Sequence, residues 1–229
     1  MKLQDRSMIT SDDIYRDLLT KIEDLTYMPG DALSENELCA QYNCSRHIVR
    51  GAFARLKEMD LLEVYPQRGS FVALLDLDYI SDALFIREAV ETTALLHALD
   101  DAELAYGTAQ KLKAVVEQQQ AFREEPIMSP EYQALDNEFH NILLDAVGKR
   151  STLALLRAQF IQLNRWRNFE LSRTRRVSGL IDEHARIAEA LEKRDGKAAV
   201  QELHNHLVTV DMTRSALEES GHAYFYRQK

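Results

Sequence analysis

Four residues in the second half of the chain have the types and the spacing of a metal site. Asp136 and His140 lie four residues apart, so on a helix they share one side and can hold one ion together. His184 and His206 each lie in the middle of an apolar helical stripe further along the chain. Because burying histidines and an aspartate without partners is costly, these residues are either metal ligands or hydrogen-bonded core residues. Their spacing alone leaves both interpretations open.

A second group of residues could bind an anion beside this cluster. Arg87 and Glu91 lie one turn apart within the apolar stripe of a helix that we expect over 80–104. A guanidinium binds a carboxylate through paired hydrogen bonds, so Arg87 is a candidate anchor for a carboxylate effector. The alternative is a buried ion pair between Arg87 and Glu91. On a later helix, periodicity does not choose among Arg157, Asn164 and Arg165. We take Glu91 and Arg165 as the further effector-binding candidates.

A metal-dependent enzyme is a formal alternative for this cluster, because a metal with three or four protein ligands can activate water. The chain, however, has no G-x-S-x-G sequence, no glycine-rich phosphate loop and no H-E-x-x-H sequence. No general base is evident beside the four ligand candidates. We therefore expect that the protein is not an enzyme.

The elements that must position these residues are helices. Apolar residues recur every three or four positions after residue 76, which predicts helices over 80–104, 108–124, 130–147, 151–171, 177–194 and 196–220. No strand pattern is evident in this part. We expect an all-helical effector-binding bundle over 79–222. A linker at 76–78 precedes it, and an aromatic tail at 223–229, whose role the sequence does not reveal, follows it.

Residues 1–75 predict a different kind of domain. A first helix is expected from Ile14 to Leu25, capped by Ser11 or Asp12. Ser34 begins a second, short helix with a capping box, S-E-N-E, and Ser45 is expected to cap a third. Helix, short turn and helix at this spacing are typical of a helix-turn-helix. Two short β-prone runs, 63–65 and 70–74, then predict a β-hairpin wing.

The third helix has the charge of a DNA-recognition helix. Ser45–Lys57 contains four arginine and lysine residues and no acid, although the whole chain has a formal net charge of -9. Arginines near the start of such a helix can reach guanine edges or phosphates in the major groove. The alternative is a solvated basic face. The residues that we expect to contact DNA are Ser34, Asn36, Ser45, Arg46, His47, Arg50, Arg68 and Gly69.

Residues 10–75 resemble the winged-helix domain of GntR-family bacterial repressors. The family pattern consists of PG-x-x-LSE-x-EL, then SR-x-PVREAL-x-RL, then a wing that ends in G-x-x-V. Segments of this chain that begin at Pro29, Leu33, Ser45 and Gly69 match this pattern in spacing. Three positions depart from it. Ile48 stands where proline is usual, Gly51 where glutamate is usual, and Asn36 where an arginine often contacts phosphate. A glycine within a helix costs about 1 kcal/mol relative to alanine.

The helical part, over 79–220, resembles the FCD effector domain of the FadR subgroup of that family. Many members present an Asp-x3-His pair and two later histidines to a divalent metal. The resemblance implies that Asp136, His140, His184 and His206 bind such an ion, with zinc or nickel expected. It also implies that Arg87 binds the carboxylate of an effector that the metal coordinates. The Gly148-Lys149-Arg150 turn departs from the more usual Gly-Asn-Pro.

These features together predict a mainly α protein with a winged helix-turn-helix and a helical effector domain. We expect a homodimeric repressor that binds a palindromic double-stranded DNA operator and responds to a small carboxylate. The nearer alternative is a metal-sensing regulator without an organic effector. No apolar run approaches the roughly 20 residues of a membrane span. Cys39 and Cys44 have no second pair, which argues for reduced thiols. We therefore expect a cytoplasmic protein with no membrane partner.

Overall fold

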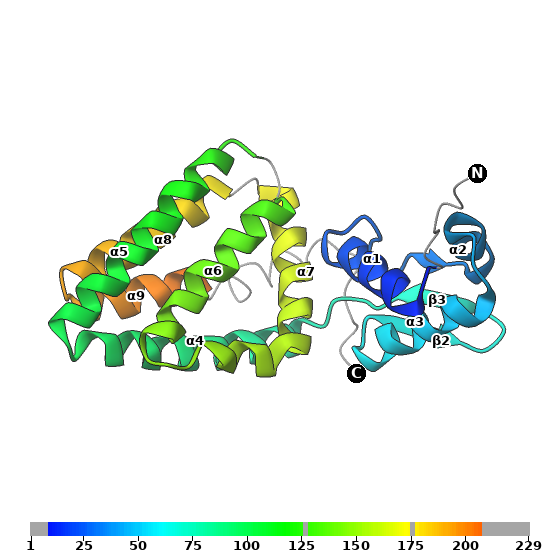
Figure 1. Ribbon diagram of the computed structural model, residues 1–229, viewed down its shortest axis with the longest axis horizontal. Coiled ribbons are helices and arrows are strands. Elements are labelled where there is room, and N and C mark those ends of the chain that lie inside the picture. Colours follow the sequence, from blue (N-terminus) through cyan, green and yellow to red (C-terminus); the bar gives the residue numbers. More distant parts are fainter. Residues whose placement is uncertain (1–8, 126–127, 175–176, 208–229) are drawn as a thin grey trace, which may run out of the picture. The chain divides into compact units, whose positions relative to one another are not determined.

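The computed structural model describes residues 9–125, 128–174 and 177–207. The described residues divide into two compact units, one that ends at Leu75 and one that begins at Asp76 (Figure 1). The first unit contains three helices and a small sheet among its described residues, and the second is helical throughout them. The expected mainly α class is thus confirmed. No helix in the described ranges has both the length and the hydropathy that crossing a membrane requires.

The first unit is a helix-turn-helix built on α1 (Ser11–Glu23), α2 (Glu35–Tyr42) and α3 (Arg46–Glu58). The cap of α1 is Thr10, not Ser11 or Asp12, because Thr10 and Asp13 form a reciprocal capping box. The core of this unit is formed by buried apolar residues of the three helices and the sheet, namely Ile14, Leu18, Ile22, Leu33, Leu38, Val49, Phe53, Leu56, Leu62 and Val72, together with Leu61.

The turn between α2 and α3 depends on a left-handed residue. Asn43 has a φ of 50°, and the Cys44 N–H donates to the Cys39 carbonyl oxygen at 3.1 Å, which ends α2. Ser45 occupies the N-cap position of α3, as expected, but its side chain makes no capping hydrogen bond. Ser34 does cap α2, because its Oγ accepts from the Glu37 N–H at 3.3 Å.

The wing is part of a three-stranded antiparallel sheet. β2 (Leu62–Tyr65) and β3 (Gly69–Val72) form the expected hairpin, and Tyr65 pairs with Gly69 at its tip. β1 (Ala32–Leu33) pairs with the other edge of β3, so the strand order is β1-β3-β2. The sequence did not predict β1, because a two-residue strand is too short to show an alternating pattern.

The glycine at position 51 has a packing role. A Cβ at this position would lie 2.5 Å from the Ser11 Oγ and 3.2 Å from the Ser11 Cβ. The absence of a side chain at Gly51 therefore lets the start of α1 approach α3 closely. This close approach is a physical reason for a residue that is otherwise unfavourable within a helix.

The second unit consists of α4 (Leu77–Leu99), α5 (Ala102–Gln119), α6 (Pro130–Ala146), α7 (Arg157–Thr174), α8 (Val177–Glu192) and α9 (Gly196–Leu207), with 3-10 turns η1 (Gln120–Phe122) and η2 (Arg150–Leu156). The expectation of one helix over 80–104 is wrong. The chain breaks after Leu99, because Asp101 caps a new helix by accepting from the Leu104 N–H at 2.8 Å. The helix expected over 151–171 begins instead with a 3-10 turn.

Two expectations concern residues outside the described ranges. The helix predicted over 196–220 is described only as far as Leu207, and the tail at 223–229 is not among the described residues.

The helices of the second unit pack around one another. α4 packs against α5, α6, α7 and α9, while α8 packs between α5 and α9. This arrangement brings the inner faces of α6, α8 and α9 together around one interior.

Candidate functional site

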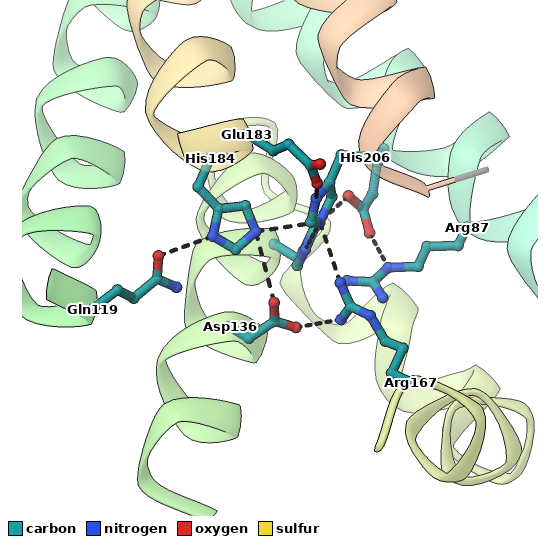
Figure 2. A network of polar contacts seen from close by, with 9 residues as sticks. Arg87, Gln119, Asp136, Arg167, Glu183, His184 and His206 are labelled. Atoms are coloured by element: carbon teal, nitrogen blue, oxygen red, sulfur yellow. Dashed lines mark hydrogen bonds and ion pairs between the residues drawn. The ribbon is translucent and has the colours of Figure 1, made fainter. Parts of the chain in front are cut away.

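The four residues proposed as metal ligands converge in the second unit. Asp136 and His140 come from α6, His184 from α8 and His206 from α9, and one ligand atom from each lies within 4.8 Å of all the others. The His206 Nε2 lies 3.2 Å from both the His140 Nε2 and the His184 Nε2. All four residues are buried. Figure 2 shows that Asp136, His184 and His206 point towards one another. The structure thus brings together residues that span 71 positions of the sequence, from Asp136 to His206, counting both ends.

Each of the three imidazoles is oriented by an oxygen behind it. The Nδ1 of His140 lies 2.6 Å from Glu91 Oε2, that of His184 lies 2.9 Å from Gln119 Oε1, and that of His206 lies 3.0 Å from Glu183 Oε2. An imidazole that donates its Nδ1–H presents Nε2 as an acceptor. Three lone pairs therefore point into the same small volume.

The histidines are held in the neutral form, which is the form that binds a metal. Burial lowers the pKa of His140 and His184 well below the ordinary value and that of His206 to about 3. Nearby arginines act in the same direction, while Asp136 opposes them. Protons therefore do not compete for the three Nε2 lone pairs at neutral pH.

The donor set fits a divalent cation. A zinc ion binds imidazole nitrogen at about 2.0–2.1 Å, so neighbouring ligands around one ion lie about 3 Å apart, close to the observed separations of 3.2 Å. The Asp136 Oδ1 is buried, accepts no hydrogen bond from the described residues and lies 3.6 Å from the His184 Nε2. The cluster could therefore hold a metal through three nitrogens and one carboxylate oxygen.

Arg167 also contacts this cluster, and the sequence did not predict that contact. Its Nη1 donates to Asp136 Oδ2 at 2.5 Å, and its Nη2 lies 3.3 Å from the His206 Nε2 (Figure 2). Burial alone would raise the pKa of Asp136, but Arg167 and the histidines lower it. Helix α7 buries polar side chains on several sides, namely Gln162, Arg165, Arg167, Asn168 and Glu170. Periodicity therefore contained no signal that singles out Arg167.

The residues expected to bind an effector lie in two different settings. Arg87 donates from Nε to Glu91 Oε1 at 2.6 Å, so the ion pair that was the alternative is present. Both side chains are buried, and the Nη groups of Arg87 make no hydrogen bond to any described residue. Arg165 is also buried, and it donates to Gln162 Oε1 at 2.7 Å. Because side chains two residues apart point about 200° apart on a helix, Arg165 and Arg167 face different directions.

The residues expected to contact DNA all lie in the first unit, and most are exposed. Asn36, Ser45, Arg46, His47, Arg50, Arg68 and Gly69 are exposed, whereas Ser34 is partly buried as a helix cap. The Arg50 Nε lies 3.0 Å from both carboxylate oxygens of Glu35. At the wing tip, the Arg68 guanidinium lies 5.7 Å from the centre of the Tyr65 ring. Gly69 has a φ of +111°, which favours glycine.

Two family models match the chain. The model of the gntR family of bacterial regulatory proteins matches residues 10–72, and that of the FCD domain matches residues 82–209. The first of these is a family of regulatory proteins, and relatives that match most of the chain are named HTH-type transcriptional regulators, so the expectation that the chain is not an enzyme is confirmed.

Relatives match along most of the chain. The HTH-type transcriptional repressor RspR of Escherichia coli is 27% identical over 93% of this chain and 92% of its own length. An HTH-type transcriptional regulator in an unstable DNA locus of Streptomyces ambofaciens is 32% identical over 86% of this chain and 82% of its own length.

Solved structures show the same fold. A GntR-type transcriptional regulator of Rhodococcus sp. RHA1 has a TM-score of 0.63 at 22% identity, over 95% of this chain and 99% of that one. McbR/YncC of Escherichia coli has a TM-score of 0.61 at 19% identity, over 94% of this chain and 100% of that one.

Proposed function

The chain belongs to the GntR family of bacterial transcription regulators that have an FCD domain, and we propose that it is a repressor controlled by a small carboxylate at a metal site. The DNA-binding head is assigned to residues 1–75, the linker to 76–78 and the effector domain to 79–222. The observation that carries the proposal is the convergence of three neutral imidazoles and the Asp136 Oδ1 in one buried volume.

Zinc or nickel is the proposed ion. Imidazole nitrogen with one carboxylate oxygen is a donor set that suits both metals. The ion would supply a positive charge that attracts an anion. Other residues of the chain would orient the ligands of the ion, because Glu91, Gln119 and Glu183 each contact one imidazole.

The effector is proposed to be an anion because of Arg87. A guanidinium has five N–H donors, and the hydrogen bond to Glu91 uses only the Nε–H of Arg87, so an anion can accept from the Nη groups. Glu91 would hold Arg87 in place through Nε, so that both Nη groups face the ligand. Arg165 remains a proposed contributor, and its hydrogen bond to Gln162 would have to open or turn towards the ligand.

DNA binding is assigned to the exposed cations of α3 and the wing. Arg46, His47 and Arg50 lie in the first turns of α3, and Arg68 lies at the wing tip. We propose that two copies of the chain form a homodimer and read a palindromic operator, because a dimer matches the symmetry of such a site. Repression is supported by the relative RspR, which is named a repressor.

An operator-binding assay tests the proposal. The full chain is titrated onto a duplex selected from a random pool, with Zn²⁺ or Ni²⁺ present, against a panel of small organic acids. We expect at least one acid to change the affinity for DNA with metal present and to have no effect after chelation or in His184→Ala. A change produced by metal alone, with no acid effective, would favour the metal sensor instead.

A further inference from the structure

Arg167 and a metal ion would need the same lone pair. The Nδ1 of His206 is engaged with Glu183 at 3.0 Å, so its Nε2 offers one lone pair. The Arg167 Nη2 lies 3.3 Å from that nitrogen. One lone pair cannot accept an N–H and also coordinate an ion. A cation bound by His206 therefore displaces the Nη2 of Arg167.

The hydrogen bond from Arg167 to Asp136 does not compete with a bound cation. Arg167 contacts Oδ2 of that carboxylate, while Oδ1 has no hydrogen-bond partner among the described residues. Asp136 can thus bind an ion through one oxygen and keep Arg167 on the other. The guanidinium stays beside the site, but one of its N–H groups loses its acceptor.

The carboxylates of Glu91 and Glu183, near Arg167, contact other residues. Glu91 is paired with Arg87 and His140, and Glu183 lies against His206. Arg167 is buried, and a charged donor without an acceptor is unfavourable in a buried site. An oxygen of an incoming ligand would provide the acceptor that the displaced N–H needs.

The formal charge of the site favours binding of the cation before the anion. Arg87 and Arg167 oppose the carboxylates of Glu91, Asp136 and Glu183, which leaves these groups with a formal charge of about -1 when the histidines are neutral. A divalent cation changes this sum to about +1, so an anion is favoured only after the cation is bound.

We propose that Arg167 couples the two ligands: a cation on His206 turns the arginine's Nη2 towards a carboxylate whose other oxygen contacts the ion. This inference rests on the proposed function and deepens it. It assigns to Arg167 the recognition of a monocarboxylate group at the ion and makes the two binding events cooperative. Because such coupling is reciprocal, the carboxylate raises the affinity for the cation by the same factor.

The test is calorimetric titration of Ni²⁺ into the full chain, with and without acetate, the simplest carboxylate probe. In the wild type, acetate should raise the affinity for Ni²⁺. In Arg167→Met, Ni²⁺ alone should bind about tenfold more tightly, because the competing guanidinium is gone, and acetate should have little effect. Arg167→Lys retains a charge near Asp136 but lacks the planar fork, so it should also lose the acetate effect.

The matched control is Arg123→Met. Arg123 makes a similar forked contact, 2.8 and 3.0 Å from the two oxygens of Asp182, but on the surface. It should behave as the wild type does. If Arg167→Met and Arg167→Lys, both folded by circular dichroism, retain the acetate effect, the role of Arg167 is wrong although the metal site stands. If the wild type binds no Ni²⁺, the metal site and this inference both fail.

Discussion

Glu91 Oε2 lies 2.6 Å from the Nδ1 of His140, with both side chains fully buried. The other oxygen of the same carboxylate accepts from the Arg87 Nε at 2.6 Å. Glu91 therefore connects the proposed metal ligand to the proposed anion anchor. It orients the imidazole so that the Nε2 lone pair faces the cluster, which is the usual task of a residue behind a metal ligand.

Replacement of Glu91 should weaken metal binding without removing a ligand. Glu91→Gln loses the charge that pairs with Arg87 and holds His140, so we expect the affinity for Zn²⁺ to fall by about 10- to 100-fold. Competition with a fluorescent chelator measures this. Glu88→Gln is the control, because Glu88 makes the same 2.6 Å contact with His204 at an exposed position. Equal affinities for the two variants would contradict a supporting role for Glu91.

Acidification should destabilise the metal-free protein. The pKa of His206 is about 3 in the fold, below its ordinary value of 6.5, and those of His140 and His184 are also lowered. The unfolded chain then binds more protons than the folded one below pH 6.5, so stability is complete above that pH and falls as the pH falls towards 3. Glu91 opposes this effect, because burial raises its pKa despite Arg87.

Urea denaturation with a chelator present, at pH 7.5 and 5.5, measures this dependence. We expect a loss on the order of 1 kcal/mol or more, because three histidines outweigh one carboxylate. His184→Asn should reduce the dependence, whereas His97→Asn, at an exposed position, should leave it unchanged. The same unfolding free energy at both pH values would show that the histidines are not held neutral.

Loss of Arg50 should weaken binding to the operator. The Glu35 carboxylate holds the Nε of Arg50, which leaves its Nη groups to approach a base edge or a phosphate. We expect Arg50→Ala to raise the dissociation constant by about 10- to 100-fold, which corresponds to the usual 1–3 kcal/mol for such a contact. Fluorescence anisotropy at several salt concentrations measures it. Arg150→Ala, which removes a surface arginine paired with Glu138, is the control, and an equal effect of both variants would argue against the assignment.

A side chain at position 51 should collide with α1. Alanine is favoured over glycine in a helix by about 1 kcal/mol, but a Cβ there would meet the Ser11 side chain at 2.5–3.2 Å. We expect Gly51→Ala alone not to stabilise the protein and the same change in a Ser11→Gly background to stabilise it by about 1 kcal/mol. Thermal unfolding of the four proteins in this cycle measures the coupling. Additive effects would mean that the close approach of α1 and α3 is unimportant.

Local patterns in the sequence were enough to predict the helices and the wing of the first unit. The capping serine Ser34, the apolar spacing of α3 and the glycine at the wing tip each act over a few residues, and each was readable. The position of Asp136 relative to His140 is likewise a property of one helix. The break between α4 and α5 was missed, because the apolar pattern continues across Asp101 and only the cap reveals the boundary.

The helix-turn-helix, the wing and the four residues of the buried cluster could be predicted from the sequence. The residues that lie behind and beside that cluster depend on how the helices pack. His140 contacts Glu91, which is 49 residues away in the sequence. Asp136 contacts Arg167 at a separation of 31 residues, and His184 contacts Gln119 at a separation of 65. Periodicity describes which side of a helix a residue occupies, but not which residue of another helix meets it. The partner of a buried polar atom depends on how the helices pack, and that packing follows from apolar burial over the whole unit.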